Sequence, residues 1–514
     1  MDIFRVRDRL VGDYRDFTGS FVDIQDKKIA AHVADRMYNG YQWPDPWLSL
    51  NPNFASGGTV TELIGAGLLQ PECERIFRLK DKGEDGPVLR LHLHQREAVE
   101  AARTGDSYVL TTGTGSGKSL AYIVPIVDRV LAAKAAGTYR PGIKAIVVYP
   151  MNALANSQLV ELGKFLQLGY PDGQPPVMFA RYTGQEKPER RAEIIANPPD
   201  ILLTNYVMLE LVLTRPRERR LIEAARGLWF LVLDELHTYR GRQGADVALL
   251  VRRLREICGA PQLQCVGTSA TMTTQGDGNA QKQAVANVAA TLFGVAVKPE
   301  RVIGETLERG TDPAGLTRSA LAARIANPAP PSDYDGFAAD PLAAWIEETL
   351  GFEPANGTER PQRRRRPLTL PEAASELAEF AGTEAETAAA AIQQTLHAGS
   401  RILSPATGRP LFAFRLHQFL SKGDNVYVTI EEPSRRHVTS TYQIAAPGTG
   451  DGPERVLVPT AFCRECGQDY LSVTRIAADG THRYAARQDN DASGGDAAGG
   501  YLFISEDQPW PRSP

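Results

Sequence analysis

Residues 108–119 read YVLTTGTGSGKS, a short apolar run that passes directly into a glycine-rich loop. A helical stretch follows the loop, so the order is strand, loop and helix. Glycines at positions 113, 115 and 117 allow the backbone to wrap around phosphate oxygens, which the loop amides and the helix N-terminus then face. In this arrangement Lys118 reaches the outer phosphates and the Ser119 hydroxyl binds Mg²⁺. The residues predicted to hold the phosphates are Thr112, Gly113, Thr114, Gly115, Ser116, Gly117, Lys118 and Ser119.

The loop departs from the generic phosphate-binding pattern at its first position. Thr112 stands where that pattern begins with glycine. The alternative interpretation is a glycine-rich turn between a strand and a helix that binds nothing. The strand before the loop and the helix after it favour the phosphate site.

An acidic motif follows a second apolar run, because residues 229–237 read WFLVLDELH. A carboxylate at the carboxyl end of a parallel strand lies at the edge where open α/β sheets bind ligands. At this edge Asp234 is predicted to hold Mg²⁺, and Glu235 to orient and deprotonate the attacking water. Together the two motifs predict a nucleotide hydrolase with Lys118, Asp234 and Glu235 as its catalytic residues.

Around these motifs, residues 90 to about 275 alternate between short apolar runs and amphipathic stretches. Because the runs are apolar on both faces, they predict the buried strands of a parallel sheet. The amphipathic stretches predict the helices of a doubly wound α/β fold. The predicted strands are Tyr108–Thr112, Lys144–Tyr149, Val177–Tyr182, Ile201–Thr204, Trp229–Asp234 and Gln264–Thr268, and the predicted helices are Ser119–Ala136, Asn152–Leu168 and Ala245–Cys258.

Small polar residues follow four of the other predicted strands. They lie in residues 150–158, 183–184, 204–206 and 268–271. Carboxyl ends of parallel strands meet at one edge, so these residues predict a rim that grips a sugar–phosphate backbone without reading bases. Taken singly, Asn152, Thr204 and Asn205 are also ordinary helix-cap or turn residues, which is the alternative.

The motifs, in their order along the chain, resemble those of the superfamily 2 DEAD/DEAH-box helicases. They read LHLHQ, TGTGSGKS, YPMNALANSQ, YTG, LLTNYVMLE, LVLDELH and TSAT. More narrowly, they are similar to the large bacterial helicases related to Lhr and to helicases of phage-defence islands of the Druantia and DISARM kinds. The resemblance implies an ATP-driven motor on DNA or RNA, built from two RecA-like domains with ATP between them.

The resemblance also implies roles for individual residues. Gln95 occupies the place of the glutamine that reads the adenine edge. Ser269 and Thr271 match the motif that couples hydrolysis to strand movement, and His237 matches the histidine that links the ATP site to it. A polar residue satisfied in the sheet rim is the alternative for His237. The residues that match the nucleic-acid-gripping motifs are Asn152, Ala155, Gln158, Thr183, Gly184, Thr204 and Asn205.

The rest of the chain carries weaker signals. We expect an N-terminal extension over 1–89, the first RecA-like domain over 90–275, an alanine-rich helical insert over 276–400, and a mixed β module with a mobile tail over 401–514. The fold class is thus α/β, with a C-terminal mixed α+β region. Arg363–Arg366, which lie between prolines, are interpreted as a solvated linker rather than a phosphate site.

Cys463 and Cys466 are spaced like half of a zinc ribbon, with Gly467 allowing the turn to close. A structural zinc site needs four ligands, and His482 is the nearest third candidate. Two unmetallated cysteines in a β turn are the alternative.

Composition limits the remaining possibilities. The net charge of −4 excludes a histone-like polycation. Five cysteines in a chain of 514 residues are too few for a disulfide framework. Its default compartment is therefore a reducing cytoplasm. No apolar run is long enough to span a membrane, so no membrane partner is expected.

The sequence shows no second βαβ series after residue 276. We therefore expect either the N-terminal part of a longer motor or one component of a split motor, with a separate polypeptide carrying the second RecA-like domain. The first functional interpretation is a Mg-ATPase component of a helicase or translocase. The alternative is a nucleotide-gated nucleic-acid-binding or regulatory subunit with little turnover of its own.

Overall fold

The structure is a computed structural model that divides into two compact units. One comprises residues 52–309 with 352–364, and the other comprises 1–51, 310–351 and 365–514. The described residues are 2–80, 86–113, 115–168, 170, 175–269, 278–352, 365–405, 408–421, 425–448, 455–478, 481–487 and 497–505. Among these, no helix is both long and apolar enough to cross a bilayer.

The first unit is built on a seven-stranded sheet in which every neighbouring pair is parallel. The strand order is β11-β5-β10-β9-β6-β8-β7. The strands of this sheet are β5 (Tyr108–Thr111), β6 (Ala145–Tyr149), β7 (Phe179–Arg181), β8 (Ile201–Asn205), β9 (Phe230–Leu233), β10 (Gln264–Ser269) and β11 (Val302–Gly304).

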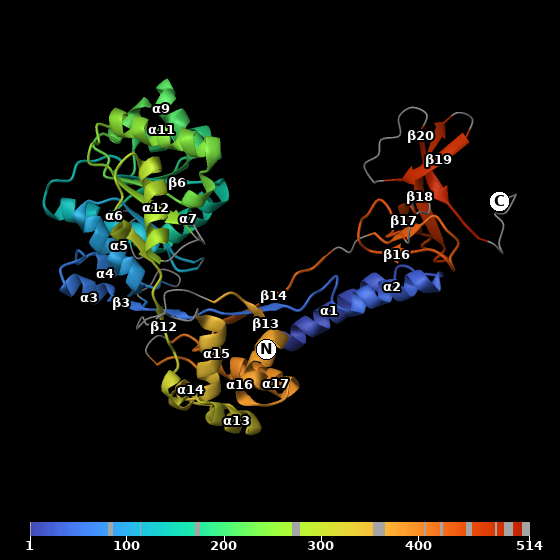
Figure 1. Cartoon of the computed structure of the whole chain (residues 1–514). Coiled ribbons are helices and arrows are strands. Elements are labelled where there is room, and N and C mark those ends of the chain that lie inside the picture. The colour runs from blue at the N-terminus through green and yellow to red at the C-terminus, as the bar shows by residue number, and fades with distance from the viewer. Residues whose placement is uncertain are drawn as a thin grey trace. The chain divides into compact units, whose positions relative to one another are not determined.

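Helices and further short strands complete this unit (Figure 1). The helices are α3 (Val60–Gly65), α4 (Cys73–Ile76), α5 (Leu93–Thr104), α6 (Leu120–Ala135), α7 (Asn152–Leu166), α8 (Pro188–Ala196), α9 (Tyr206–Thr214), α10 (Arg219–Ala224), α11 (Gly241–Ile257) and α12 (Gly278–Phe293). The short strands are β2 (Asn53–Phe54), β3 (Ser56–Thr59), β4 (Arg90–His92) and β12 (Leu307–Glu308).

Two hydrophobic cores cover the two faces of the parallel sheet. Successive residues of a strand enter different cores: Leu110 packs with α6, whereas Val109 packs with α11 and α12. This alternation explains why the strands are apolar at every position, since neither face meets water. The result is the predicted RecA-like α/β fold, and all six predicted strands are confirmed.

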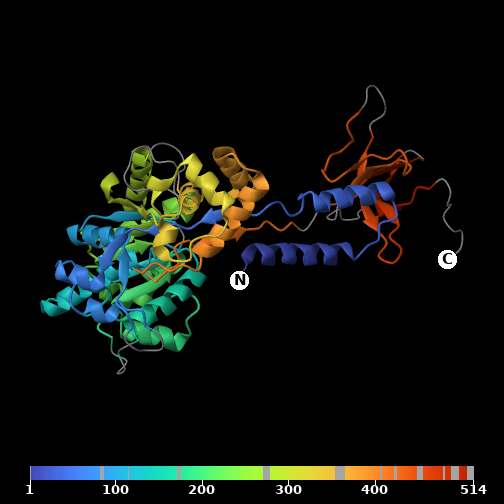
Figure 2. The same ribbon diagram turned by 90° about the horizontal axis from the view of Figure 1, so that it is seen from below.

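The second unit contains an α-helical part and a β module (Figure 2). The helices are α1 (Ile3–Gly19), α2 (Lys27–Tyr38), α13 (Arg318–Ala326), α14 (Tyr334–Ala338), α15 (Pro341–Gly351), α16 (Leu370–Ala381) and α17 (Ala385–Gly399). The strands are β1 (Trp47–Leu50), β13 (Leu368–Thr369), β14 (Phe414–His417), β15 (Tyr427–Thr429), β16 (Val438–Thr439), β17 (Leu457–Phe462), β18 (Asp469–Ala478), β19 (Thr481–Ala486) and β20 (Ala497–Leu502).

In the α-helical part, α13–α17 share one apolar core with β1 of the antiparallel sheet β13-β1-β14. Local signals define α16 clearly. Thr369 and Glu372 form a capping box at its start, and Gly382 ends it in the left-handed conformation. Within the predicted insert, helices α12–α17 alternate with the short strands β11, β12 and β13.

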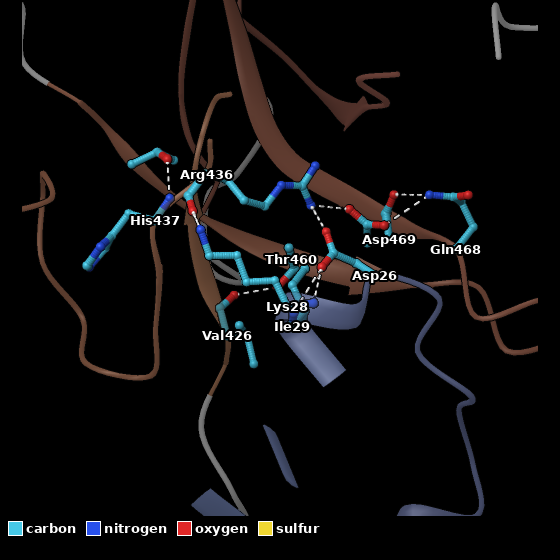
Figure 3. Close-up of polar contacts among 10 residues, drawn as sticks. Asp26, Lys28, Ile29, Val426, Arg436, His437, Thr460, Gln468 and Asp469 are labelled. Carbon is cyan, nitrogen blue, oxygen red and sulfur yellow. Dashed lines mark hydrogen bonds and ion pairs between the residues drawn. The ribbon is translucent and has the colours of Figure 1, made fainter. Parts of the chain in front are cut away.

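The β module is held to the N-terminal segment through a buried arginine. Arg436 is 1% exposed, and its Nη1 lies 3.1 Å from Asp26 Oδ2 and 2.5 Å from Asp469 Oδ2 (Figure 3). Asp26 also caps α2, and Lys28 Nζ donates to the Arg436 carbonyl at 2.6 Å. Ile29 of α2 is buried in the core of the module. The module thus includes a helix from the opposite end of the chain.

The compact units divide the chain differently from the four predicted segments. The predicted N-terminal extension is shared between the units at residue 52, and residues 278–309 belong to the unit with the parallel sheet. The physical reason is β11, which pairs with β5 and adds the seventh strand. The predicted extension contains helices α1, α2, α3 and α4. Arg363 and Arg364 lie outside the described residues.

Candidate nucleotide and nucleic-acid site

The glycine-rich loop lies between β5 and α6, as its sequence predicts. Gly115 and Gly117 have φ angles of +81° and +70°, which residues with a Cβ rarely adopt. Thr112 and Ser116 are buried, with their hydroxyl oxygens 2.6 Å apart, so the threonine at the first position braces the loop from inside. Thr114 lies outside the described residues.

Lys118 extends from the loop toward the end of β9. Its Nζ lies 3.7 Å from Glu235 Oε1, and the side chain is 11% exposed. Within the described parts of the chain, Nζ is buried without a hydrogen-bond partner. A buried ammonium without hydrogen bonds is unfavourable, so the geometry suits an anionic ligand such as a phosphate.

The acidic motif is held by the neighbouring strand β10. The Thr268 hydroxyl donates to Asp234 Oδ1 at 2.5 Å and accepts from the Glu235 amide at 3.1 Å. Burial raises the pKa of Asp234, and the Glu235 carboxylate acts in the same direction. Glu235 is the non-glycine residue recorded with positive φ in the described chain, at 53°. This strained backbone turns Glu235 out of the strand direction.

Asp234 after β9 and Ser119 at the start of α6 fit a hard divalent cation. Asp234 and Ser119 offer carboxylate and hydroxyl oxygens, which Mg²⁺ prefers, and nucleotide phosphates commonly complete its coordination. Glu235 Oε2, like Lys118 Nζ, is buried without a hydrogen-bond partner among the described residues. Lys118 Nζ and Glu235 Oε2 can therefore bind a ligand. Glu235 Oε2 also lies 3.3 Å from His237 Nδ1.

His237 lies between the acidic motif and the end of β10. Its Nδ1 is 3.3 Å from the Ser269 hydroxyl at the end of β10 and 3.3 Å from Glu235 Oε2. One imidazole therefore contacts both the acidic motif and the following motif. Thr271, the other predicted coupling residue, lies outside the described residues.

Gln95 contacts the phosphate-binding loop from the start of α5. Its Nε2 donates to the Gly117 carbonyl at 2.9 Å, and its Oε1 accepts from the His92 amide at 2.8 Å. In this structure the donor and the acceptor thus both bond to backbone. The recognition of adenine by Gln95 stays a prediction.

Two predicted nucleic-acid-gripping residues bond directly to each other across the sheet edge. Asn205 Nδ2 donates to Asn152 Oδ1 at 2.7 Å, while Asn205 Oδ1 accepts from the Met208 amide and caps α9. A hollow of about 330 Å³ lies beside them, bringing together the ends of β6, β7 and β8. It is lined by Pro150, Asn152, Gly184, Asn205, Tyr206, Val207, Met208 and Leu211.

Other predicted rim residues are buried. Ala155, Thr183 and Thr204 are at most 1% exposed. Thr183 donates its hydroxyl to Glu186, and Thr204 donates to the Tyr182 carbonyl at 2.7 Å. Gln158 is partly buried. These side chains shape the rim in this structure, and their contact with nucleic acid stays a prediction.

The cysteine pair forms a tight turn. The Gly467 amide donates to the Cys463 carbonyl at 2.9 Å, and Gly467 has a φ of +73°. Backbone amides of Cys466 and Glu465 lower the pKa of Cys463. The described residues contain no cluster of three potential metal ligands, so His482 does not complete a site and zinc stays a prediction.

Sequence reasoning did not identify three residues at this site. Thr268 was noted only as part of a polar strand end, although it orients the whole acidic motif. His94 contacts the Ser116 carbonyl at 3.0 Å, and Glu305 accepts from the Gly113 amide at 3.0 Å. The histidine adjoins the predicted Gln95, but nothing in the sequence links Glu305 to a loop 192 residues earlier.

Comparison with known proteins agrees with this geometry. Residues 92–277 match the family model described as DEAD/DEAH box helicase. This part of the chain is a DEAD/DEAH box helicase domain. The matched range contains the glycine-rich loop, the acidic motif and the polar rim, but ends before β11.

Curated relatives of this helicase domain are longer proteins. The Druantia protein DruE of Escherichia coli is 26% identical over 45% of this chain and 18% of its own length. The uncharacterized ATP-dependent helicase YprA of Bacillus subtilis is 31% identical over 41% of this chain and 25% of its own length. The chain thus spans a quarter or less of these two relatives.

Solved helicase structures are also similar. The helicase Lhr of Mycobacterium smegmatis, bound to ssDNA and AMP-PNP, is 28% identical with a TM-score of 0.30, covering 35% of this chain and 23% of its own. The helicase MrfA bound to DNA is 20% identical with a TM-score of 0.39, covering 58% of this chain and 38% of its own.

Proposed function

We propose that this chain is the nucleotide-hydrolysing component of a nucleic-acid helicase or translocase. The convergence of Lys118, Asp234, Glu235 and Thr268 at one sheet edge supports this proposal most directly. Two of these side chains, Lys118 and Glu235, keep a buried polar atom without a hydrogen-bond partner among the described residues, which supports roles in binding a phosphate group and a water.

Each residue then has a defined task. Lys118 binds the outer phosphates of ATP, and the loop amides hold the remaining phosphate oxygens. Glu235 holds the attacking water and accepts its proton, while Thr268 fixes the backbone and carboxylate on either side. Asp234 and Ser119 hold Mg²⁺, which neutralises charge on the phosphates when it is bound.

The rim beside the nucleotide site takes a single strand of DNA or RNA. Asn152, Asn205 and Gly184 line the same hollow and offer amide donors from side chains and backbone. Such donors bind phosphate and sugar oxygens without selecting a base. His237, between Glu235 and Ser269, transmits the state of the ATP site to β10.

Complete turnover requires a further partner, a second RecA-like domain that supplies arginine to the transferred phosphate. Among the described residues, parallel strands occur in one sheet alone, and the other sheets contain antiparallel pairs. Arginines of this kind commonly raise turnover by about a thousandfold or more. We therefore expect Mg-ATP binding with slow hydrolysis by this chain.

Phosphate release with Mg-ATP, measured with no nucleic acid, with single-stranded DNA and with single-stranded RNA, tests the proposal. Hydrolysis stimulated by one of the two strands supports a motor component and selects its substrate. ATP binding with no hydrolysis under any condition would favour a nucleotide-gated regulatory subunit. Failure of the folded chain to bind Mg-ATP would contradict the nucleotide site itself.

Zinc is a separate proposal for the Cys463–Cys466 turn. The closed turn and the amides that face Cys463 support half of a thiolate site. Metal analysis of the purified chain tests it, with the double variant Cys463→Ser/Cys466→Ser as the control. Equal zinc content in the two proteins would contradict the proposal.

A further inference from the structure

Residues 302–309 lead the chain out of the unit that contains the parallel sheet, and they run beside the phosphate-binding loop. Strand β11 pairs in parallel with β5, so that Gly304 lies opposite Thr111. The Thr111 hydroxyl also donates to the Ile303 carbonyl at 3.3 Å. Glu305 is therefore the first residue beyond the sheet edge, at the same level as the beginning of the loop.

Glu305 contacts the loop directly. The Gly113 amide donates to Glu305 Oε2 at 3.0 Å, in a partly buried position. A hydrogen bond between an amide and a carboxylate is stronger than one between neutral groups. This bond fixes the point at which the chain turns from β5 into the loop.

The segment that follows Glu305 reaches the loop by a second route. The Thr306 carbonyl accepts from the Ala55 amide at 2.9 Å, and the Ala55 carbonyl accepts from the Leu93 amide at 2.8 Å at the start of α5. Strand β12 pairs with β2 at the same place, where Leu307 is completely buried. The exit segment thus holds the N-terminus of α5.

The start of α5 then returns to the loop. Phe54 of β2 packs against the His94 ring with centroids 5.4 Å apart. His94 Nε2 lies 3.0 Å from the Ser116 carbonyl. Because burial lowers the pKa of His94 to about 4, the ring is neutral near pH 7 and Nε2 carries its proton as the donor. The exit segment therefore holds the loop at Gly113 and, through β2 and α5, at Ser116.

We propose that Glu305 is a positioning residue of the ATP site, which couples the phosphate-binding loop to the segment by which the chain leaves the helicase domain. The inference rests on the proposed function. Filling of the loop by ATP then orders residues 303–308, and displacement of these residues loosens the loop. Glu305 acts through the Gly113 amide and does not itself touch the nucleotide.

The test uses two substitutions of Glu305 and one matched control. Glu305→Ala removes the acceptor, whereas Glu305→Gln keeps an acceptor oxygen without the charge. Glu308→Ala removes an exposed acidic side chain from the same segment. The affinity of the full chain for a fluorescent ATP analogue with Mg²⁺ is measured for each, together with hydrogen exchange of residues 303–308 with and without nucleotide.

We expect Glu305→Ala to bind about tenfold more weakly, as loss of one hydrogen bond to a charged group implies. Glu305→Gln should bind only about threefold more weakly, because it keeps the acceptor oxygen and loses the charge alone. Nucleotide should slow exchange at 303–308 in wild type and Glu308→Ala but not in Glu305→Ala. If Glu305 only stabilised the fold, nucleotide would still slow exchange at 303–308 in Glu305→Ala.

Wild-type affinity in Glu305→Ala, or an unchanged effect of nucleotide on exchange at 303–308, would overturn the inference while leaving the proposed function intact. Equal weakening in Glu305→Gln and Glu305→Ala would also overturn it, because the acceptor oxygen would then not be what matters. Absence of nucleotide binding by the folded wild type would overturn the proposed function and this inference together.

Discussion

The helicase domain and the β module (residues 425–505 with α2) use buried charge in opposite ways. In the helicase domain, Lys118 Nζ lies 3.7 Å from Glu235 Oε1, and neither Lys118 Nζ nor Glu235 Oε2 has a hydrogen-bond partner among the described residues, which suits binding of a ligand. In the β module, Arg436 lies between Asp26 and Asp469 and is directed at the fold itself. The two sets therefore differ in their location. Lys118 and Glu235 meet at the sheet edge beside the glycine-rich loop, whereas Arg436, whose Nε also lacks a hydrogen-bond partner among the described residues, lies between carboxylates from two distant segments.

Replacement of Lys118 by alanine should produce the largest effect. It removes the protein side-chain cation that we place on the outer phosphates, so we expect loss of measurable ATP binding while the fold is kept. Lys164→Ala is the control, because that lysine pairs with Glu161 on the surface of α7. Titration with a fluorescent ATP analogue checks the result. Retained affinity in folded Lys118→Ala would mean that its ammonium does not face a ligand.

Glu235→Gln separates binding from hydrolysis at the same site. The amide can still accept a hydrogen bond from water but cannot take its proton, so phosphate release should fall by about a hundredfold or more. ATP affinity should remain close to wild type. Loss of binding equal to that of Lys118→Ala would show that Glu235 serves the fold, as Arg436 does.

Arg436→Met tests the other side of the comparison. The substitution leaves the Asp26 and Asp469 carboxylates buried without their cation, which should cost about 3–5 kcal/mol of local stability. Hydrogen exchange of β17 and β18 should therefore accelerate, whereas exchange of β5 should not change. Arg435→Met is the matched control, because its side chain is 77% exposed. Equal protection in the two variants would show that the buried arginine does not join the segments.

His94 gives the smallest effect and links stability to pH. Burial lowers the pKa of His94 from 6.5 to about 4, so its neutral form is favoured in the folded state. The contribution of neutral His94 to the free energy of unfolding is fully present above pH 6.5 and is lost as the pH falls toward 4. Between pH 8 and pH 5 the helicase domain should lose about 2 kcal/mol through this residue.

Hydrogen exchange of β5 at the two pH values, corrected for intrinsic exchange rates, measures this loss. His94→Gln keeps a donor for the Ser116 carbonyl but does not titrate near these pH values. The variant should therefore lose less stability on acidification than wild type. A similar loss in both proteins would assign the pH dependence to other groups.

The core of the helicase domain was predictable because its signals are local and repeated. Each predicted strand is followed within a few residues by its polar end, and the parallel sheet brings these ends to one edge. The bond between Asn152 and Asn205 follows from that rule. Strand β11 was not predicted because its place as the seventh strand depends on its pairing with β5, about 190 residues earlier, which the sequence does not show.

Residues whose role depends on distant partners were not predictable. Thr268 resembles any small polar residue at a strand end until β10 is placed beside β9. Arg436 is one of many charged residues in the sequence, and Asp26 lies more than 400 positions before it. The sequence also does not show that the N-terminal segment divides between two units at residue 52. That division depends on which distant residues each part packs against.

By itself, the sequence determined the phosphate-binding loop, the acidic motif and the parallel α/β fold between them. These features arise from backbone conformation and strand periodicity, which depend on neighbouring residues. Only the tertiary structure decided that Glu305 holds the Gly113 amide and that Arg436 joins α2 to the β module. Such contacts form when burial removes alternative partners such as water, so they become defined only after the chain has packed.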